Sequence, residues 1–148
     1  MEDQFIGLCC CGNLKAAKEY LRLYPDINIS IGNELAFRNA CYRGRLEIAK
    51  WLLSVKPDID ISAKNDYAFH LACKNEHLEI AKWLQSLNPY VYVIEYGIDG
   101  NYTGYKIRSK EDATFEKRKN ALHLTHQEKT NLLYHLPIDI AKTVTQFV

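Results

Sequence analysis

A stretch of twenty residues occurs twice in the chain, 32 positions apart, and this repetition constrains the fold more than any other feature. Residues 33–52 read NELAFRNACYRGRLEIAKWL, and residues 65–84 read NDYAFHLACKNEHLEIAKWL. A period of this length is typical of stacked arrays, in which each unit buries its apolar face only against its neighbours. The period also runs back to the start of the chain, and we expect repeat units at 33–64 and 65–89 after an N-terminal capping unit at 1–32.

Each unit is expected to contain two antiparallel helices. In the third unit Phe69, Ala72 and Cys73 fall on one helical face, and a second apolar stripe follows in HLEIAKWL. A glycine separates the two patterns in the first two units, and Glu76 takes its place in the third. The alternating connectors PDINISIGN and PDIDISAKN predict small hairpins between units. Asn33 and Asn65, at the end of the connectors, tolerate the left-handed turn that leads into the next helix.

The sequence YAFHLACKNEHLEIAKWL resembles the ankyrin repeat pattern T-P-L-H-x-A-A-x-x-G-H-x-x-x-V-x-x-L-L. The resemblance covers residues 33–89 and continues in register through 1–32, although Leu35-Ala36 and Tyr67-Ala68 stand where the family has Thr-Pro. It is most similar to the ankyrin families of giant amoeba-infecting viruses. This resemblance implies a mostly α solenoid, a monomer that binds a protein partner, and a location in the cytoplasm of a host cell.

The repeat ends at Pro89, and residues 90–148 are expected to form a C-terminal extension. Two strand-like runs flank GIDG and predict a β-hairpin over 90–108. Ser109 with Asp112 three residues on predicts a helix over 110–125, with a modest apolar face of Phe115, Leu122 and Leu124. A terminal helix is expected over 137–147. Since the open ends of an array expose its core, these helices are expected to act as caps.

Composition excludes several classes of protein. The net charge of +1 does not provide the broad basic field of a nucleic-acid-binding protein, and no apolar run is long enough for a membrane helix. The start of the chain lacks the pattern of a secretory signal, so an intracellular, soluble protein is expected. Cys9, Cys41 and Cys73 recur with the period and are therefore expected to be small buried core residues. Cys10 and Cys11 have no such counterparts.

The sequence offers little for catalysis. It contains no phosphate-binding glycine loop, no H-E-x-x-H and no nucleophile elbow, so we expect neither an enzyme nor a cofactor. His123 and His126, with His135 nearby, form the most metal-like cluster and leave a metal-dependent enzyme as an alternative. No carboxylate or cysteine has a complementary spacing, which favours ordinary surface histidines.

A binding function has more support, because the core positions of the two similar units match while their surface positions differ. Such differences are expected on the concave surface lined by the first helix of each unit and by the connectors. Tyr and Arg are frequent energetic centres of interfaces. The candidate partner-binding residues are Arg38, Asn39, Tyr42, Arg43, Lys64, Asp66, Lys74 and Asn75.

The final residues, LPIDIAKTVTQFV, are similar to the opening of an F-box, as in poxvirus ankyrin proteins. That resemblance implies recruitment of the adaptor subunit of a cullin-type ubiquitin ligase by an amphipathic helix. The residues that would face the adaptor are Leu136, Pro137, Ile140, Val144 and Phe147. The same apolar stripe would also serve an end cap, and one face cannot perform both roles at once.

Overall fold

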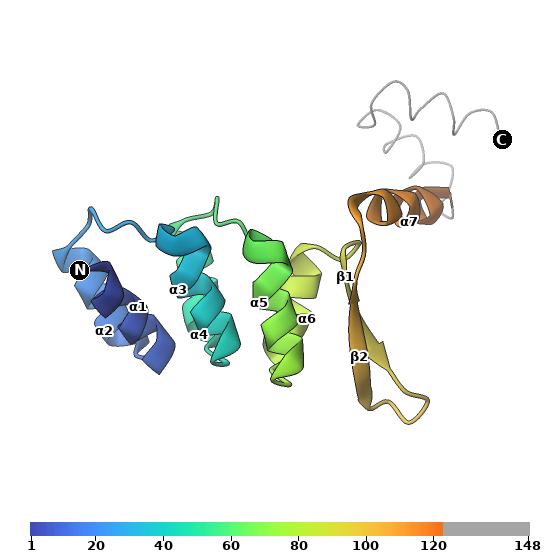
Figure 1. Cartoon of the computed structure of the whole chain (residues 1–148), viewed down its shortest axis with the longest axis horizontal. Coiled ribbons are helices and arrows are strands. Elements are labelled where there is room, and N and C mark those ends of the chain that lie inside the picture. The colour runs from blue at the N-terminus through green and yellow to red at the C-terminus, as the bar shows by residue number, and fades with distance from the viewer. Residues whose placement is uncertain (123–148) are drawn as a thin grey trace, which may run out of the picture. The chain divides into compact units, whose positions relative to one another are not determined.

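The computed structural model describes residues 1–122, which belong to two compact parts. The first part spans residues 1–107, and the second begins at Arg108. The first part contains three pairs of helices followed by a two-stranded hairpin (Figure 1). This order confirms the expected array of paired helices with a β-hairpin after it. The helices are α1 (Glu2–Cys11), α2 (Leu14–Leu23), α3 (Ile31–Tyr42), α4 (Leu46–Val55), α5 (Ala63–Lys74) and α6 (Leu78–Leu87).

The first helix of each pair makes the main contacts between units. Helix α1 packs on α3 and α3 packs on α5, while each also packs on the second helix of its own unit. Figure 1 shows these pairs following one another along the chain. The core therefore runs through the units as one cluster, in which a phenylalanine, a cysteine and an alanine recur in every unit. These residues are at most 1% exposed: Phe5, Cys9, Ala17, Phe37, Cys41, Ala49, Phe69, Cys73 and Ala81.

The periodic cysteines behave as buried apolar residues. Cys41 is completely buried, and burial raises the pKa of its thiol well above the ordinary value of 9.0. Burial likewise raises the pKa of the Cys9 thiol to about 12 and that of the Cys73 thiol to about 11. Since a protonated thiol is a weak nucleophile and a poor metal ligand, these positions serve packing.

The turn between the two helices of a unit has a left-handed residue at its centre. Gly12 and Gly44 have φ of 84° and 73°, and Glu76 adopts φ of 57° at the equivalent place. Next to Gly44, the His77 side chain of the following unit lies so close that a Cβ on Gly44 would be 2.9 Å from its ring. The His77 Nε2–H donates a hydrogen bond of 3.0 Å to the carbonyl oxygen of Tyr42. Neighbouring units are therefore joined at this turn.

The connectors between units differ from expectation, because residues 24–30 and 56–62 contain turns and no strands. The small hairpins predicted there were wrong. The Asn28 side-chain oxygen accepts the backbone N–H of Ser30 at 3.1 Å, and Asp60 accepts that of Ser62 at 3.0 Å. Such local hydrogen bonds close a turn without any pairing of strands.

Each connector continues into a short left-handed turn at the start of the first helix of the next unit, α3 or α5. Asn33 has φ of 58° in the second unit and Asn65 has φ of 58° in the third, so the expected role of these asparagines is confirmed. Their neighbours Glu34, Lys64 and Asp66 share the conformation. Left-handed backbone costs roughly 1–2 kcal/mol for each residue with a Cβ. The turns therefore need compensating contacts.

The hairpin consists of β1 (Tyr92–Tyr96) and β2 (Tyr102–Ile107), paired antiparallel with Tyr92 opposite Ile107. Strand β1 contacts α6 and β2 contacts α5, so the hairpin lies against the third unit. Tyr92 is completely buried, and its ring stacks on that of Phe69 with centroids 4.3 Å apart. The hairpin therefore extends the core of the array.

The second part contains α7 (Lys110–Leu122) among its described residues. The Ser109 hydroxyl oxygen accepts the backbone N–H of Asp112 at 3.1 Å and donates to the Asp112 carboxylate at 2.9 Å. This is the start predicted from the spacing of these two residues. Phe115 is 65% exposed, so the expected apolar face of this helix is not buried at that position. Leu124 and the terminal helix expected over 137–147 lie outside the described residues.

Candidate partner-binding surface

Two stripes of side chains, one on α3 and one on α5, form a surface that carries half of the candidate residues. On each helix the positions follow the i, i+3, i+4, i+7 spacing of one helical face, opposite the buried face. The two stripes lie at equivalent positions of neighbouring units, since α3 packs on α5. We call this surface the α3–α5 face; it comprises Leu35, Arg38, Asn39, Tyr42, Tyr67, His70, Leu71 and Lys74.

Arg38 lies at the centre of this face, but its guanidinium is occupied. Its Nε donates to the carbonyl oxygen of Asn33 at 2.7 Å, and its Nη2 donates to that of Gly32 at 2.8 Å. These bonds satisfy two carbonyls of the left-handed turn. The guanidinium carbon also lies 5.5 Å from the centre of the Tyr67 ring, in the next unit. Arg38 therefore stabilises the turn and positions Tyr67.

A chain of ring contacts then connects α5 to the hairpin. Tyr67 and His70 stack with centroids 6.5 Å apart, and His70 meets Tyr105 of β2 edge to face at 5.6 Å. The Tyr105 hydroxyl and His70 Nδ1 are hydrogen-bonded to each other. As a result, β2 continues the surface beyond α5. Neither Tyr67 nor Tyr105 was among the residues predicted from sequence.

Tyr42 and Arg43 form an exposed pair at the end of α3. Tyr42 is 38% exposed, and the Arg43 guanidinium carbon lies 5.2 Å from the centre of its ring. The backbone of Tyr42 is held by the hydrogen bond from His77. An aromatic ring on a fixed backbone loses little conformational entropy when it binds a partner.

The candidate residues near α5 divide into free and engaged side chains. Lys64 and Lys74 are exposed and make no ion pair within residues 1–122. The Asn75 side-chain amide donates to the carbonyl oxygen of Leu71 at 2.8 Å and so ends its own helix. Asp66 is half-buried and accepts the Tyr92 hydroxyl at 2.6 Å. Asp66 therefore holds the hairpin against the third unit.

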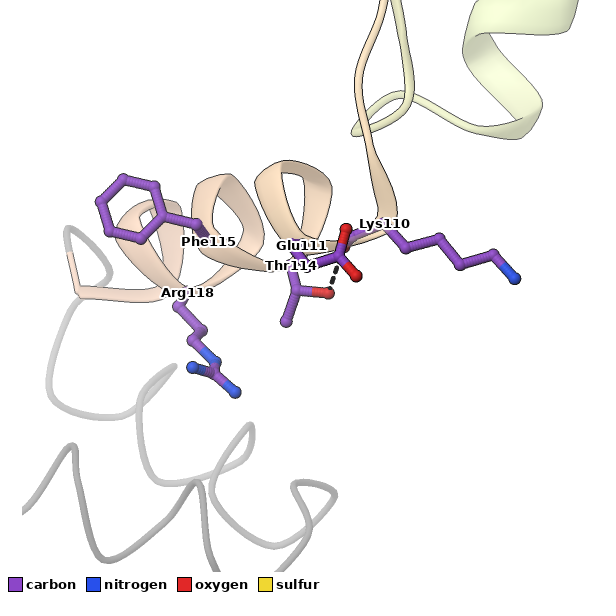
Figure 2. A pocket seen from close by; sticks show the side chains of 5 residues that line it. All are labelled: Lys110, Glu111, Thr114, Phe115 and Arg118. Carbon is purple, nitrogen blue, oxygen red and sulfur yellow. Dashed lines mark hydrogen bonds between the residues drawn. The ribbon is translucent and has the colours of Figure 1, made fainter.

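Metal-ligating groups and pockets are the other features of the described residues, 1–122, that bear on chemistry. Within that part no group of three or more His, Cys, Asp or Glu residues could hold a metal ion. His123, His126 and His135 lie outside the described residues. A shallow hollow beside α7 is lined by one helix, and in it the Thr114 hydroxyl donates to the Lys110 carbonyl at 2.7 Å (Figure 2). None of the helices through Leu122 has the length and apolar character required to cross a membrane.

Comparison with known protein families identifies ankyrin repeats in this chain. Residues 37–85 match the family of ankyrin repeats (many copies), from α3 into α6. The match includes the α5 stripe and most of the α3 stripe. Comparison with curated proteins and with solved structures gives no match. Residues 37–85 thus contain ankyrin repeats, and proteins built from such repeats generally bind other proteins.

Proposed function

We propose that this protein is a noncatalytic interaction module that binds a protein partner through the α3–α5 face. The observation that carries the proposal is the contrast between the two ankyrin units. Their buried residues are the same, Phe37 with Phe69 and Cys41 with Cys73, whereas the exposed positions of the face differ. The shared core accounts for the first set. The positions of the face that differ between the units can instead be adapted to a partner.

The composition and rigidity of the face support the same conclusion. Tyr42 and Tyr67 are 38% and 42% exposed, and each is held by a cation against its ring. Tyrosine and arginine side chains that become buried when a partner binds are among those that contribute most to the binding free energy of interfaces. The face is short, since it spans two helices and only β2 continues it, and it therefore fits a modest interface of the size found in transient complexes.

The test is capture of partners by the full chain and by a double variant, Tyr42→Ala with Arg43→Ala. Lys15→Ala with Lys18→Ala on α2 is the matched control, since both lysines are exposed and lie on another helix. We expect partners to be lost with the first variant and kept with the second. If the first variant retained every captured partner, the α3–α5 face would not be the binding surface.

The absence of catalysis is part of the proposal. The periodic thiols are buried and their pKa values are raised, and His70 is held by Tyr105. Metal analysis of the purified chain tests the alternative function, a metal-dependent enzyme. Zinc bound at one equivalent, and lost on replacement of His123 and His126, would indicate a metal-dependent activity.

A second proposal concerns the C-terminal segment and rests on its F-box-like sequence. In this proposal Leu136, Pro137 and Ile140 recruit the adaptor of a ubiquitin ligase in an infected host cell, while the repeats hold the target. Ile140→Asp is compared with deletion of residues 136–148. Loss of ligase subunits with unchanged thermal stability supports an adaptor site. Loss of thermal stability instead indicates a cap.

A further inference from the structure

The charges of the α3–α5 face and its immediate neighbours are unbalanced. Arg43, Lys64 and Lys74 are exposed, and none of them pairs with a carboxylate within residues 1–122. The Arg38 guanidinium donates hydrogen bonds to two backbone carbonyls, but these bonds leave its positive charge unneutralised. Four cations therefore lie on the α3–α5 face or directly beside it.

The two carboxylates at the starts of α3 and α5, next to this face, are buried or half-buried and accept hydrogen bonds within the protein. Glu34 is 8% exposed and accepts the Ser30 hydroxyl at 2.8 Å, while Asp66 accepts the Tyr92 hydroxyl at 2.6 Å. Glu76, in the turn after α5, is the exposed carboxylate that follows Lys74 and Asn75 along the chain. The face consequently presents more positive than negative charge to solvent, in a chain whose net charge is +1.

Apolar surface lies between these charges. Tyr67 is 42% exposed, and Leu35 and Leu71, on the same two stripes, are half-buried. The Tyr67 ring contacts both the Arg38 guanidinium and the His70 ring. A ligand that matches the face must therefore offer an apolar side chain to the rings and carboxylates to the surrounding cations.

Building on the proposed function, we propose that the α3–α5 face binds an acidic segment of its protein partner, in which Asp or Glu residues flank an apolar side chain. Complementary charge of this kind gives specificity and accelerates association. Nucleic acid is less well matched, because binding through about 6–10 phosphate contacts needs more cations than the four that this face and its immediate neighbours offer.

A displayed library of random peptides, selected on the full chain, provides the first test. Captured peptides are then screened against Arg43→Glu with Lys74→Glu, and against Lys15→Glu with Lys18→Glu, which changes the net charge equally on α2. We expect peptides enriched in Asp and Glu, weakened about tenfold or more by the first pair and unchanged by the second. Arg43→Gln with Lys74→Gln replaces the reversal pair if that pair fails to fold.

The outcomes separate this inference from the function on which it rests. Peptides that require Tyr42 but lack acidic residues would overturn the acidic ligand and leave the binding function intact. If both charge-reversal pairs weakened peptide binding equally, the peptides would be attracted by the overall charge of the chain, and the proposed acidic ligand of this face would also be overturned. If no captured peptide depended on the face, both proposals would fall. An oligonucleotide that displaced the selected peptides at lower concentration than unlabelled peptide would assign the face to nucleic acid.

Discussion

The hydroxyl of Tyr92, at the start of the hairpin, donates a hydrogen bond of 2.6 Å to the carboxylate of Asp66, at the start of α5. The Tyr92 ring meanwhile stacks on Phe69, and the side chain is completely buried. One residue thus joins the hairpin to the third unit by a polar and an apolar contact. Both contacts can be tested separately.

Removal of the hydroxyl alone should destabilise the protein measurably. Tyr92→Phe keeps the stacked ring but leaves the half-buried Asp66 without its donor, and we expect a loss of about 1–3 kcal/mol in the free energy of unfolding. Tyr92→Ala also removes the ring and should cost about 3–5 kcal/mol. Urea denaturation followed by circular dichroism measures both values. Equal stability of Tyr92→Phe and wild type would show that the hydrogen bond contributes nothing.

Alkaline pH should destabilise the chain through its buried thiols. Each buried thiol has a folded pKa above its unfolded value near 9, so its contribution is complete below pH 9 and is lost as pH rises from there. A thiol such as Cys41, which stays protonated in the fold, adds a slope of up to about 1.4 kcal/mol per pH unit above pH 9.

The unfolding free energy measured at several values between pH 8 and about 11 tests this slope. Cys41→Ala creates a small cavity and lowers stability at every pH, but its decline with rising pH should be shallower than that of wild type. A parallel decline in the two proteins would contradict the prediction.

Replacement of Glu76 by glycine should stabilise the chain. Glu76 is exposed and holds φ of 57° at the position where the other units have Gly12 and Gly44. Relief of the left-handed strain outweighs the greater freedom of glycine when unfolded, and we expect a gain of about 0.5–1 kcal/mol. The reverse exchange, Gly44→Ala, should destabilise, since its Cβ would also meet His77 at 2.9 Å. Thermal unfolding of the two variants should shift in opposite directions.

Substitutions of Arg38 and Tyr42, two residues of the same stripe, should affect stability differently, because Arg38 has a structural role and Tyr42 is proposed to bind the partner. Arg38→Ala removes two hydrogen bonds to the left-handed turn and should lower the unfolding free energy by about 1 kcal/mol. Tyr42→Ala removes an exposed ring and should change it by less than about 0.5 kcal/mol. Chemical denaturation measures both. A larger loss for Tyr42→Ala would mean that this ring supports the fold.

The repeat explains why the core was predictable from sequence. A residue that recurs at the same place in three units must meet the same neighbours each time, so the burial of Phe69 or Cys73 follows from the period. The connectors were less predictable, since their alternation of apolar and polar residues suggested strands. In the structure Asn28 and Asp60 close turns locally, and this local hydrogen bonding takes the place of strand pairing.

The candidate surface was only partly predictable. The differences between units indicated Arg38, Tyr42 and Lys74, and the structure places them on one face. Tyr67 could have been found by extending the same helical stripe three positions back from His70. Tyr105 could not, because its contact with His70 joins residues 35 positions apart and depends on how the hairpin packs against α5.

The ring contacts at the three junctions suggest how arrays of this kind change in length. Phe5 meets Trp51 at 6.2 Å, Phe37 meets Trp83 at 6.2 Å, and Phe69 meets Tyr92 of the hairpin. If an extra copy of the middle unit were inserted before the third, its tryptophan would meet the phenylalanine of the preceding unit. Its phenylalanine would meet the tryptophan of the following unit. Gene duplication could therefore lengthen the recognition surface in steps of 32 residues without any change at the two ends.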